Sequence, residues 1–418
     1  MNKNQSFSQA SLSRYLYPQD FFNDPRLSND IFRNKCLDTS LSIATSLFSG
    51  GISLDNIKIK QKSGYRVSNL AEKLILRKCA EHLKSALGLS TKHRDQICKE
   101  LVIFLKEGSP YRIYRLDIQA FFETLDVLRI KSSLRNIEYL STHTKNLLCS
   151  YLDLFKSSFG NGLPRGVEIS PALADFSLKE FDENIQKNDE VFYYERFVDD
   201  IIIITSSNEN QSDFLSDLST KLLGRLQFNK SKEVIITVKK RTKSSSKSSD
   251  TPVAQFDFLG YEYSVLDTCI PKNEKNIYRE VHLDISLKKV KNYKSRISKA
   301  LYNHCKNPDF DLLYDRLTFL VTNRNLRQKK KKIKIPTGIY YNYSMVSKES
   351  KSLKLLDSYL KHSILSTNTR LGNLVSSSIS KTQRSKLLCL SFVDGFIRRN
   401  FKEFSPNRLG KIAKIWQL

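Results

Sequence analysis

Three aspartates interrupt sequence that otherwise favours β-strands. Asp199 and Asp200 are adjacent in YYERFVDDIIIIT (residues 193–205), and Asp117 follows the apolar residues of YRIYRLDI. Because an ionised carboxylate is costly to bury without compensation, the adjacent acids predict a tight hairpin turn with both at its tip. Such a turn would normally contain Gly or Asn, and neither is present. An Asp pair alone is also common in ordinary solvated loops.

The position of Asp117 favours chemistry over a solvated loop. It ends one apolar strand just before Phe121 and Phe122, and the Asp pair lies at the end of another strand. Side by side, two such strands would gather three carboxylates around a site about 4 Å across, the spacing of a two-metal centre. Hard oxygen ligands suit two Mg²⁺ ions, with Mn²⁺ as the alternative ion, and no His or Cys is required. The pattern therefore predicts catalytic, metal-binding roles for Asp117, Asp199 and Asp200.

Composition favours a polyanionic partner. The 418-residue chain has 69 Lys and Arg against 43 Asp and Glu, so its formal net charge is +26. Neutralised phosphates release condensed counterions, which makes nucleic acid the expected partner, although a merely basic protein is the alternative.

Nothing in the sequence indicates a membrane or an oxidising compartment. No stretch approaches the roughly 20 apolar residues of a membrane span, and the N-terminal residues lack the apolar core of a signal peptide. Seven scattered cysteines without a CxxC pair predict reduced thiols and no zinc site. We therefore expect a cytoplasmic protein that does not bind a membrane.

Periodicity predicts an α+β chain. Residues 57–67 are expected to form two short strands around Ser63-Gly64, and residues 70–87 have a helical period. From YRIYRLDI to about residue 265, strands and helices alternate as in one compact α+β domain. The Ser/Lys-rich segment 239–252 predicts a mobile loop, and residues 280–418 are basic and predicted to be mainly helical.

A loop rich in glycine and proline lies between the two acidic segments. Gly162, Pro164 and Gly166 punctuate it, and Ser170-Pro171 mark the start of a helix with Ser170 as its cap. The backbone of such a loop can approach a nucleotide or a template base. An ordinary loop-to-helix connection is the common alternative.

Taken in order, these segments resemble the reverse transcriptases. The matching motifs are DIQAFF, LPRGVEISP, FVDD, LQFNKSKE and FDFLGYEY, which cover roughly half of the chain. The resemblance implies a right-hand polymerase fold with fingers, a palm on an RRM-like antiparallel sheet, and a helical thumb. The implied domains are an N-terminal extension at 1–50, fingers at 51–110, the palm at 111–265, and a thumb with a basic, mainly helical C-terminal region at 266–418.

The resemblance also implies a role for individual residues. Asp117 and Asp199 would bridge both metals, and Asp200 would complete the set. Phe122 occupies the steric-gate position, where its ring would exclude a ribose 2′-hydroxyl; core packing is the alternative. The other nucleotide-binding residues implied are Arg66, Lys62, Arg165, Gly166 and Lys232, and the primer-grip residues are Phe258, Leu259 and Gly260. For Lys232, a solvated charge is an equal alternative.

A finer resemblance concerns biological setting. SPYRIYRLDIQAFFETLD, YDRLTFLV, GIYYNYS and LLDSYLKH resemble the bacterial unknown-group and abortive-infection reverse transcriptases, which act in defence against phage. The opening QSFSQASLSRYLYPQDFF resembles the smaller polymerases of type-3, two-polymerase systems. The partners implied are a non-coding RNA template, a DNA product, deoxynucleotide triphosphates, and a second reverse transcriptase subunit or further copies of this chain.

Three functions stay open. The first is RNA-directed DNA synthesis in antiphage defence, the second is template-independent or protein-primed synthesis on the same fold, and the third is a non-catalytic RNA-binding subunit. Tyr340, Tyr341 and Tyr343 are speculative priming residues, although aromatic packing or base stacking explains them more simply. The basic run 327–334 is either an RNA-backbone contact or a solvated loop. Retention of all three acids together with Phe122 argues against the non-catalytic function.

Overall fold

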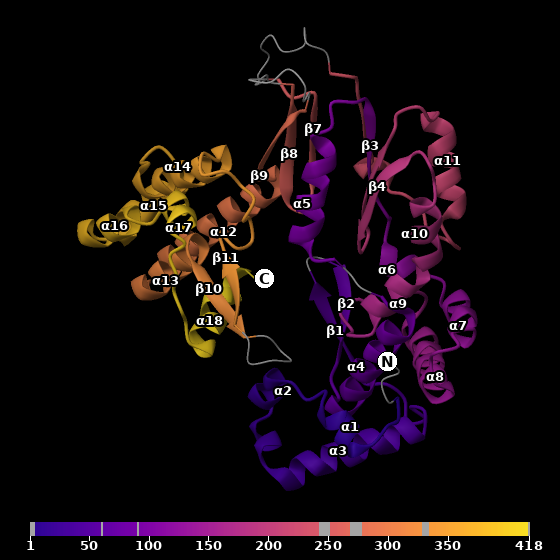
Figure 1. The fold of residues 1–418 in the computed structure, drawn as a ribbon. Coiled ribbons are helices and arrows are strands. Elements are labelled where there is room, and N and C mark those ends of the chain that lie inside the picture. Colours follow the sequence, from indigo (N-terminus) through magenta and orange to yellow (C-terminus); the bar gives the residue numbers. More distant parts are fainter. Residues whose placement is uncertain are drawn as a thin grey trace. The chain divides into compact units, whose positions relative to one another are not determined.

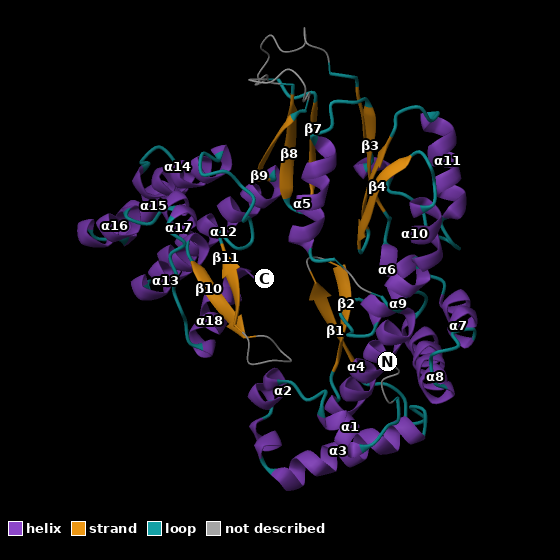
Figure 2. Cartoon of the chain, viewed as in Figure 1, coloured by secondary structure: helices purple, strands orange, loops and turns teal. Residues whose placement is uncertain are grey.

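The computed structural model describes residues 5–59, 62–89, 92–241, 251–267, 278–327 and 334–416. The chain divides into two compact units. Unit 1 comprises residues 1–104 and 109–240, and unit 2 comprises residues 105–108 and 241–418. Figure 1 follows the chain through both units, and Figure 2 shows its strands, which form four separate sheets among the described residues.

The elements up to the end of unit 1 are α1 (Gln9–Ser13), α2 (Pro18–Asn23), α3 (Asp30–Thr45), β1 (Leu54–Ile59), β2 (Lys62–Val67), α4 (Leu70–Leu87), α5 (Arg94–Leu105), β3 (Tyr111–Asp117), α6 (Phe121–Thr124), α7 (Val127–Arg135), α8 (Thr142–Phe159), α9 (Ser170–Ser177), α10 (Lys179–Gln186), β4 (Val191–Phe197), β5 (Asp200–Thr205), α11 (Gln211–Lys221) and β6 (Val234–Val238). The helix predicted over 70–87 is confirmed as α4. It ends at Gly88, whose φ of 62° suits a left-handed cap. The helices α1 and α3 pack against it.

The main sheet of unit 1 has the strand order β4-β5-β3-β6, with every neighbouring pair antiparallel. Adjacent side chains of β4 point to opposite faces: the Tyr193 hydroxyl donates to the Ile97 carbonyl of α5 at 3.1 Å, and the Tyr194 hydroxyl donates to Asp182 of α10 at 2.5 Å. Helices therefore cover both faces, and α10 and α11 lie beside this sheet in Figure 1. A central strand covered on both faces can be continuously apolar, which explains the buried Ile201–Ile204 run of β5.

The β1–β2 hairpin does not turn where the sequence predicted. Its register pairs Ile59 with Lys62, so the connection is at residues 60–61, which lie outside the described residues. Ser63 and Gly64 lie within β2 instead, with Gly64 opposite Ile57. Gly64 is not among the glycines with a positive φ, so its backbone conformation needs no glycine. The Ser-Gly turn signal was therefore wrong at this position.

Unit 2 contains β7 (Ala254–Phe258), β8 (Tyr261–Leu266), β9 (Glu280–Ile285), α12 (Leu287–Lys306), α13 (Phe310–Val321), β10 (Asn323–Arg327), β11 (Lys334–Gly338), α14 (Lys351–Leu365), α15 (Arg370–Ser378), α16 (Lys381–Leu388), α17 (Phe392–Ile397) and α18 (Pro406–Ala413). The helix α12 packs against α13, α14 and α15. The β7–β8 hairpin forms a three-stranded sheet with β9, so by its contacts it belongs to unit 2.

The mainly helical prediction for residues 280–418 is confirmed except at three strands. The sequence did not reveal β9 or the β10–β11 hairpin, whose polar sequences NRNLR and KIPTG lack apolar alternation. The basic run 327–334 joins β10 to β11, but residues 328–333 lie outside the described residues, as do residues 242–250 of the Ser/Lys-rich segment. In the part of the chain that the structure describes, every helix is too short or too polar to cross a membrane.

Candidate active site

Strand register brings the three predicted aspartates together. Asp117 is the last residue of β3 and pairs directly with Asp200, the first residue of β5. Asp199 lies in the preceding turn, and its carbonyl accepts a hydrogen bond from the Ile118 amide at 3.0 Å. The acids thus share one end of the main sheet, although more than 80 residues of sequence separate Asp117 from the other two. Their metal-binding role stays a prediction.

The turn that carries Asp199 is strained. Phe197 pairs with Asp200, so Val198 and Asp199 form a two-residue hairpin loop. Val198 has a φ of 63°, in the left-handed region that a β-branched residue rarely adopts. Backbone strain of this kind costs about 1–3 kcal/mol and clusters at functional sites. The missing Gly or Asn noted in the sequence is therefore a real departure from ordinary turn chemistry.

Two cations compensate the buried acids. The Lys232 ammonium lies 2.8 Å from both carboxylate oxygens of Asp117, which is only 4% exposed. Arg115 places Nη2 3.3 Å from Oδ1 of Asp200 and donates through Nη1 to the Lys232 carbonyl at 2.8 Å. The side chain of Asn229 also donates through Nδ2 to Asp117 Oδ2 at 3.4 Å. Such pairing is what makes a buried charge tolerable.

The pKa of Asp200 reports the mutual proximity of these charges. Burial raises the pKa of its carboxyl above the ordinary value, and the negative charges of Asp199 and Asp117 raise it further. The positive charges of Arg115 and Lys232 oppose this rise. The Asp200 carboxylate is therefore within electrostatic reach of both other acids and of both cations.

The donor set suits a hard divalent cation, although it is not arranged around one. Among the described residues, no group of three His, Cys, Asp or Glu side chains is positioned to hold a metal ion. All three acids nevertheless offer carboxylate oxygens, the ligands that Mg²⁺ prefers, from one end of the sheet. Because Lys232 neutralises Asp117 here, a divalent ion bound to that carboxylate would have to exchange with the ammonium group.

The glycine-rich loop packs against the segment that follows Asp117. The Leu163 amide donates to the Phe122 carbonyl at 2.7 Å, and a Cβ on Gly162 would lie 2.5 Å from that same oxygen. Phe122 is buried, and the Arg165 guanidinium lies 5.1 Å from the centroid of its ring. Arg165 is in turn fixed by two hydrogen bonds to Glu123, at 3.0 and 3.1 Å. Close backbone approach therefore explains the glycine at 162.

The predicted phosphate-binding arginine lies on a hairpin that touches this loop. The Tyr65 amide of β2 donates to the Arg165 carbonyl at 2.7 Å. The neighbouring Arg66 is 65% exposed and pairs across the hairpin with Asp55 at 3.0 Å. Exposed ion pairs of this kind contribute only about 0–1 kcal/mol, so Arg66 can be drawn away by a phosphate. Lys62 begins β2, but its side chain lies outside the described residues.

Ser170 does not cap α9 as predicted. It is the first helical residue, and Ile169 occupies the cap position without a side-chain hydrogen bond. The Ser170 hydroxyl donates instead to the Pro164 carbonyl at 2.7 Å. It therefore ties the glycine-rich loop, including Gly166 with its φ of 98°, to the start of the helix.

The remaining predicted residues belong to unit 2. Buried Phe258 ends β7, and Leu259 and Gly260 form the turn to β8 with φ values of 47° and 86°. Tyr343 is only 5% exposed and lies 5.9 Å from Tyr261, ring centroid to ring centroid. That burial agrees with the packing explanation for Tyr343.

Tyr340 and Tyr341 are also packed in unit 2. Tyr340 and Tyr341 are both half-buried, and their rings contact each other edge to face. The Arg399 guanidinium lies 4.2 Å from the Tyr340 ring centroid. Neither ring therefore stands free in solvent.

Residues 59–263 match a family described as reverse transcriptase (RNA-dependent DNA polymerase). This chain carries a reverse transcriptase domain. Domains of this family are RNA-directed DNA polymerases, a class of nucleotidyltransferase, and they generally use divalent metal ions. The described residues form a mixture of helices and sheets, and the family match supports a fold of the right-hand polymerase kind.

Solved telomerase structures show a distant similarity. Apo telomerase from Candida tropicalis, truncated from its C-terminal domain, is 13% identical with a TM-score of 0.33, covering 51% of this chain and 53% of that one. Telomerase from Candida albicans, in complex with a TWJ fragment of telomeric RNA, is 12% identical with a TM-score of 0.34, covering 87% of this chain and 61% of that one. This chain therefore spans less than two thirds of either protein's length. No curated protein matches it.

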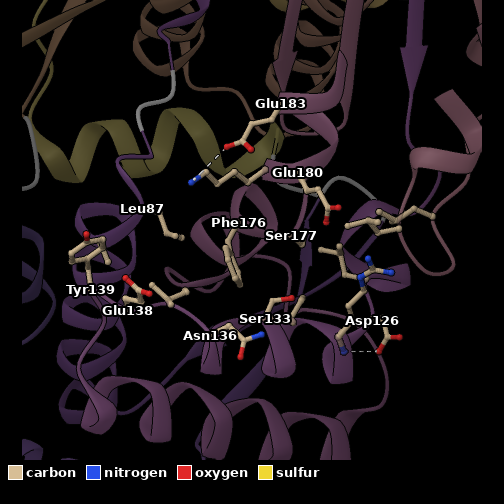
Figure 3. Close-up of a pocket in the computed structure, with 18 residues that line it drawn as sticks. Leu87, Asp126, Ser133, Asn136, Glu138, Tyr139, Phe176, Ser177, Glu180 and Glu183 are labelled. Carbon is tan, nitrogen blue, oxygen red and sulfur yellow. Dashed lines mark hydrogen bonds and ion pairs between the residues drawn. The ribbon is translucent and has the colours of Figure 1, made fainter. Parts of the chain in front are cut away.

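A pocket elsewhere in the reverse transcriptase domain is not the polymerase site. It encloses about 510 Å³ beside α7, α9 and α10, and none of the three aspartates lines it (Figure 3). Its wall includes the apolar side chains of Leu87 and Phe176, while Glu138, Glu180 and Glu183 also line it. With Asp126, these acids outnumber the two basic residues of the lining, Arg129 and Lys179, and this balance disfavours a phosphate backbone.

The sequence did not single out Arg115, Asn229 or Arg196. A signal existed for Arg115, because it precedes Asp117 by two positions in the same strand and therefore points to the same face. Asn229 lies within the fourth motif, and its amide contact with Asp117 depends on tertiary packing. Arg196 donates a hydrogen bond to the Val198 carbonyl at 3.1 Å, a contact that no local sequence pattern reveals.

We predict that Gly162→Ala weakens the domain more than Gly160→Ala. Both glycines have positive φ, at 89° and 102°, but only at position 162 would a Cβ meet backbone atoms, within 2.6 Å. Gly162→Ala should lower the free energy of unfolding by more than about 1 kcal/mol and reduce nucleotide incorporation. Urea unfolding and primer extension measure the two effects. Equal losses in both variants would contradict a special role for the close approach to Phe122.

Proposed function

We propose that this reverse transcriptase joins deoxynucleotides at Asp117, Asp199 and Asp200 on a non-coding RNA template. Residues 51–110 would form the fingers, 111–265 the palm and 266–418 the thumb, after an N-terminal extension. The observation that supports this site most directly is the register that sets Asp117 opposite Asp200. When bound there, two Mg²⁺ ions, or Mn²⁺, supply Lewis-acid activation of a primer 3′-hydroxyl and stabilisation of the leaving pyrophosphate.

Two positively charged side chains of this chain already position two of the three carboxylates. Arg115 holds the Asp200 carboxylate at the sheet end, and Lys232 holds that of Asp117. Once released from Asp117, the Lys232 ammonium would be free to donate hydrogen bonds to nucleotide phosphates. Arg66, together with Lys62 of the same strand, would bind the triphosphate, because the ion pair of Arg66 with Asp55 is exposed and weak.

Selection of the sugar would depend on Phe122. Its carbonyl is held by Leu163, and its ring is covered by Arg165, so the side chain has little freedom to move away from a ribose. Arg165 and Gly166 would line the nascent base pair from the same loop. Phe258, Leu259 and Gly260 would serve as the primer grip in the β7–β8 turn.

The biological setting that we propose is cytoplasmic antiphage defence. The resemblance of four segments to defence-associated reverse transcriptases supports it, as does the net charge of +26, which suits a chain bound to RNA. A second reverse transcriptase subunit, or further copies of this chain, would complete the assembly. Protein priming has less support, since Tyr343 is buried and its neighbours Tyr340 and Tyr341 are packed.

Replacing any one of the three acids with Asn should abolish nucleotide incorporation. The substitution keeps the side-chain shape but removes the charge, so we expect a loss of at least roughly 10³-fold. Asp213→Asn, in the exposed first turn of α11, is the matched control and should retain activity. EDTA should stop the reaction and added Mg²⁺ should restore it. Full incorporation by Asp199→Asn would refute this site.

The same assay distinguishes templated from untemplated synthesis. The chain is purified with its bound RNA, and the RNA and the labelled product are both sequenced. A product whose sequence follows deliberate changes in the RNA supports RNA templating. A product unaffected by those changes would instead favour template-independent synthesis, and a labelled protein band would favour protein priming.

Phe122→Val should relax sugar selection. A smaller side chain leaves room for a 2′-hydroxyl, so the preference for deoxynucleotides over ribonucleotides should fall at least about tenfold. Phe121→Val is the control, because Phe121 is a neighbour that is also buried and has no assigned gate role. Competing incorporation of dNTP and rNTP measures the ratio. The gate assignment fails when both variants change this ratio by the same factor.

Defence is tested in cells. Bacteria that carry the complete locus are challenged with phage, and plating efficiency is compared between the wild-type gene and Asp199→Asn. We expect Asp199→Asn to abolish protection against phage, because defence would require DNA synthesis. Equal protection by both genes would favour the non-catalytic RNA-binding function. If neither gene protects the cells, the defence assignment is rejected.

A further inference from the structure

The Arg196 side chain forms a hydrogen bond with the strained turn that carries Asp199. Arg196 lies in β4, opposite Ile201 of β5. Its Nη1 atom donates to the Val198 carbonyl at 3.1 Å. That carbonyl belongs to the peptide group linking Val198 to Asp199, so the hydrogen bond fixes the peptide plane from which Asp199 departs.

The rest of the guanidinium is anchored to two helices. Nε and Nη2 form a bidentate pair with Asp182 of α10, at 2.9 and 2.7 Å, and Nη1 also reaches Asp175 of α9 at 3.2 Å. The Arg196 side chain is only 7% exposed. The Tyr194 hydroxyl adds a further hydrogen bond to Asp182. Arg196 thus connects the turn to the helix pair that follows the glycine-rich loop.

The charges in this network are mutually dependent. Burial alone would lower the pKa of the Arg196 guanidinium, but the hydrogen bonds and charge of Asp182 outweigh it, so the pKa is raised. Burial raises the pKa of the Asp175 carboxyl, and Arg196 opposes that rise. Arg196 therefore stays charged, and a neutral or differently shaped replacement would leave two partly buried carboxylates without their cation.

The turn needs such an anchor because Val198, a β-branched residue, disfavours the positive φ that the turn requires. Val198 has a positive φ and Asp199 does not, which is the pattern of a turn with glycine preferred at its first central position. A valine there persists only when surrounding contacts over-determine the backbone. Among the described contacts of this two-residue loop, the Val198 carbonyl is held by Arg196 and the Asp199 carbonyl by Ile118.

We propose that Arg196 is a positioning residue, which locks the strained Val198 turn to α9 and α10 and so sets the place of the Asp199 carboxylate. This inference rests on the proposed catalytic role of Asp199. Only arginine fits, because a planar fork is needed to engage a carboxylate with two parallel donors while a third donor reaches the carbonyl. Lysine would keep the charge but lose that geometry.

Arg196→Lys is the principal test, with Arg112→Lys as its matched control. Arg112 is also a largely buried arginine of the main sheet, paired with Glu209 at 2.7 Å, but it lies opposite Thr205 at the far end of β5 from the aspartates. Both variants should lower thermal stability. Only Arg196→Lys should lower kcat, by about 10²-fold, with an unchanged KM for the nucleotide, because a displaced carboxylate affects the chemical step.

Val198→Gly supplies a readout that loss of stability would not reproduce. Glycine adopts a positive φ without strain, so the turn should then hold its shape with less help from Arg196. In that background, Arg196→Lys should cost less than about tenfold in kcat. The same 10²-fold loss with and without the valine would overturn the proposed clamp, as would equal kcat losses for Arg196→Lys and Arg112→Lys.

A second variant keeps the test decisive if Arg196→Lys does not fold. Asp182→Asn retains the arginine but removes one anchor, and it should lower kcat without changing KM; a wild-type kcat would reject the proposal. Asp199→Asn is assayed alongside. If Asp199→Asn keeps its activity, the proposed function is wrong; if it is inactive while the Arg196 and Asp182 variants keep wild-type kcat, only the positioning role is wrong.

Discussion

Charge compensation at one end of the main sheet is the constraint on which the rest of this domain depends. Antiparallel pairing places Asp117 opposite Asp200, with Asp199 in the adjoining turn, so three carboxylates must share a small region of partly buried space. Burial raises the pKa of Asp200, and repulsion from Asp199 and Asp117 adds to that rise. Lys232 and Arg115 offset that repulsion at hydrogen-bonding distance. A neutral strand end would not need either cation.

The helix α9 joins two parts of the site that are separate in sequence. At its start, the Ser170 hydroxyl holds the Pro164 carbonyl of the glycine-rich loop. Within the helix, Asp175 contacts Arg196, which holds the turn of the aspartates. The loop itself contacts Phe122 through Leu163. One helix therefore fixes the loop beside the proposed sugar gate and the turn that carries Asp199 relative to a common support.

Local signals predicted the parts of this structure that local energetics decide. The helical period of residues 70–87 became α4, and Asp117 ends a strand as predicted, because charged residues cannot continue a buried strand cheaply. The predicted hairpin is also present, but only Asp199 lies in its two-residue loop, and Asp200 begins β5. The Ser63-Gly64 turn failed because register, not composition, decided where the β1–β2 hairpin reverses. The Ser170 cap failed because a tertiary partner, Pro164, competed for its hydroxyl. The sequence did not single out Arg196 because its contacts with Asp182 and Asp175 also depend on tertiary packing.

The Lys232 contact shows how the proposed metal ion could enter a site whose charge is already compensated. Asp117 is a core residue, whereas the Lys232 side chain is 45% exposed, so only one partner of the ion pair is fixed by packing. Separating them requires rotation about bonds of a flexible, partly solvated chain rather than opening of the sheet. Arg115 differs, because it is only 19% exposed and also donates to the Lys232 carbonyl. The site thus combines one exchangeable positive charge with one fixed charge, and the exchangeable one faces the most buried acid.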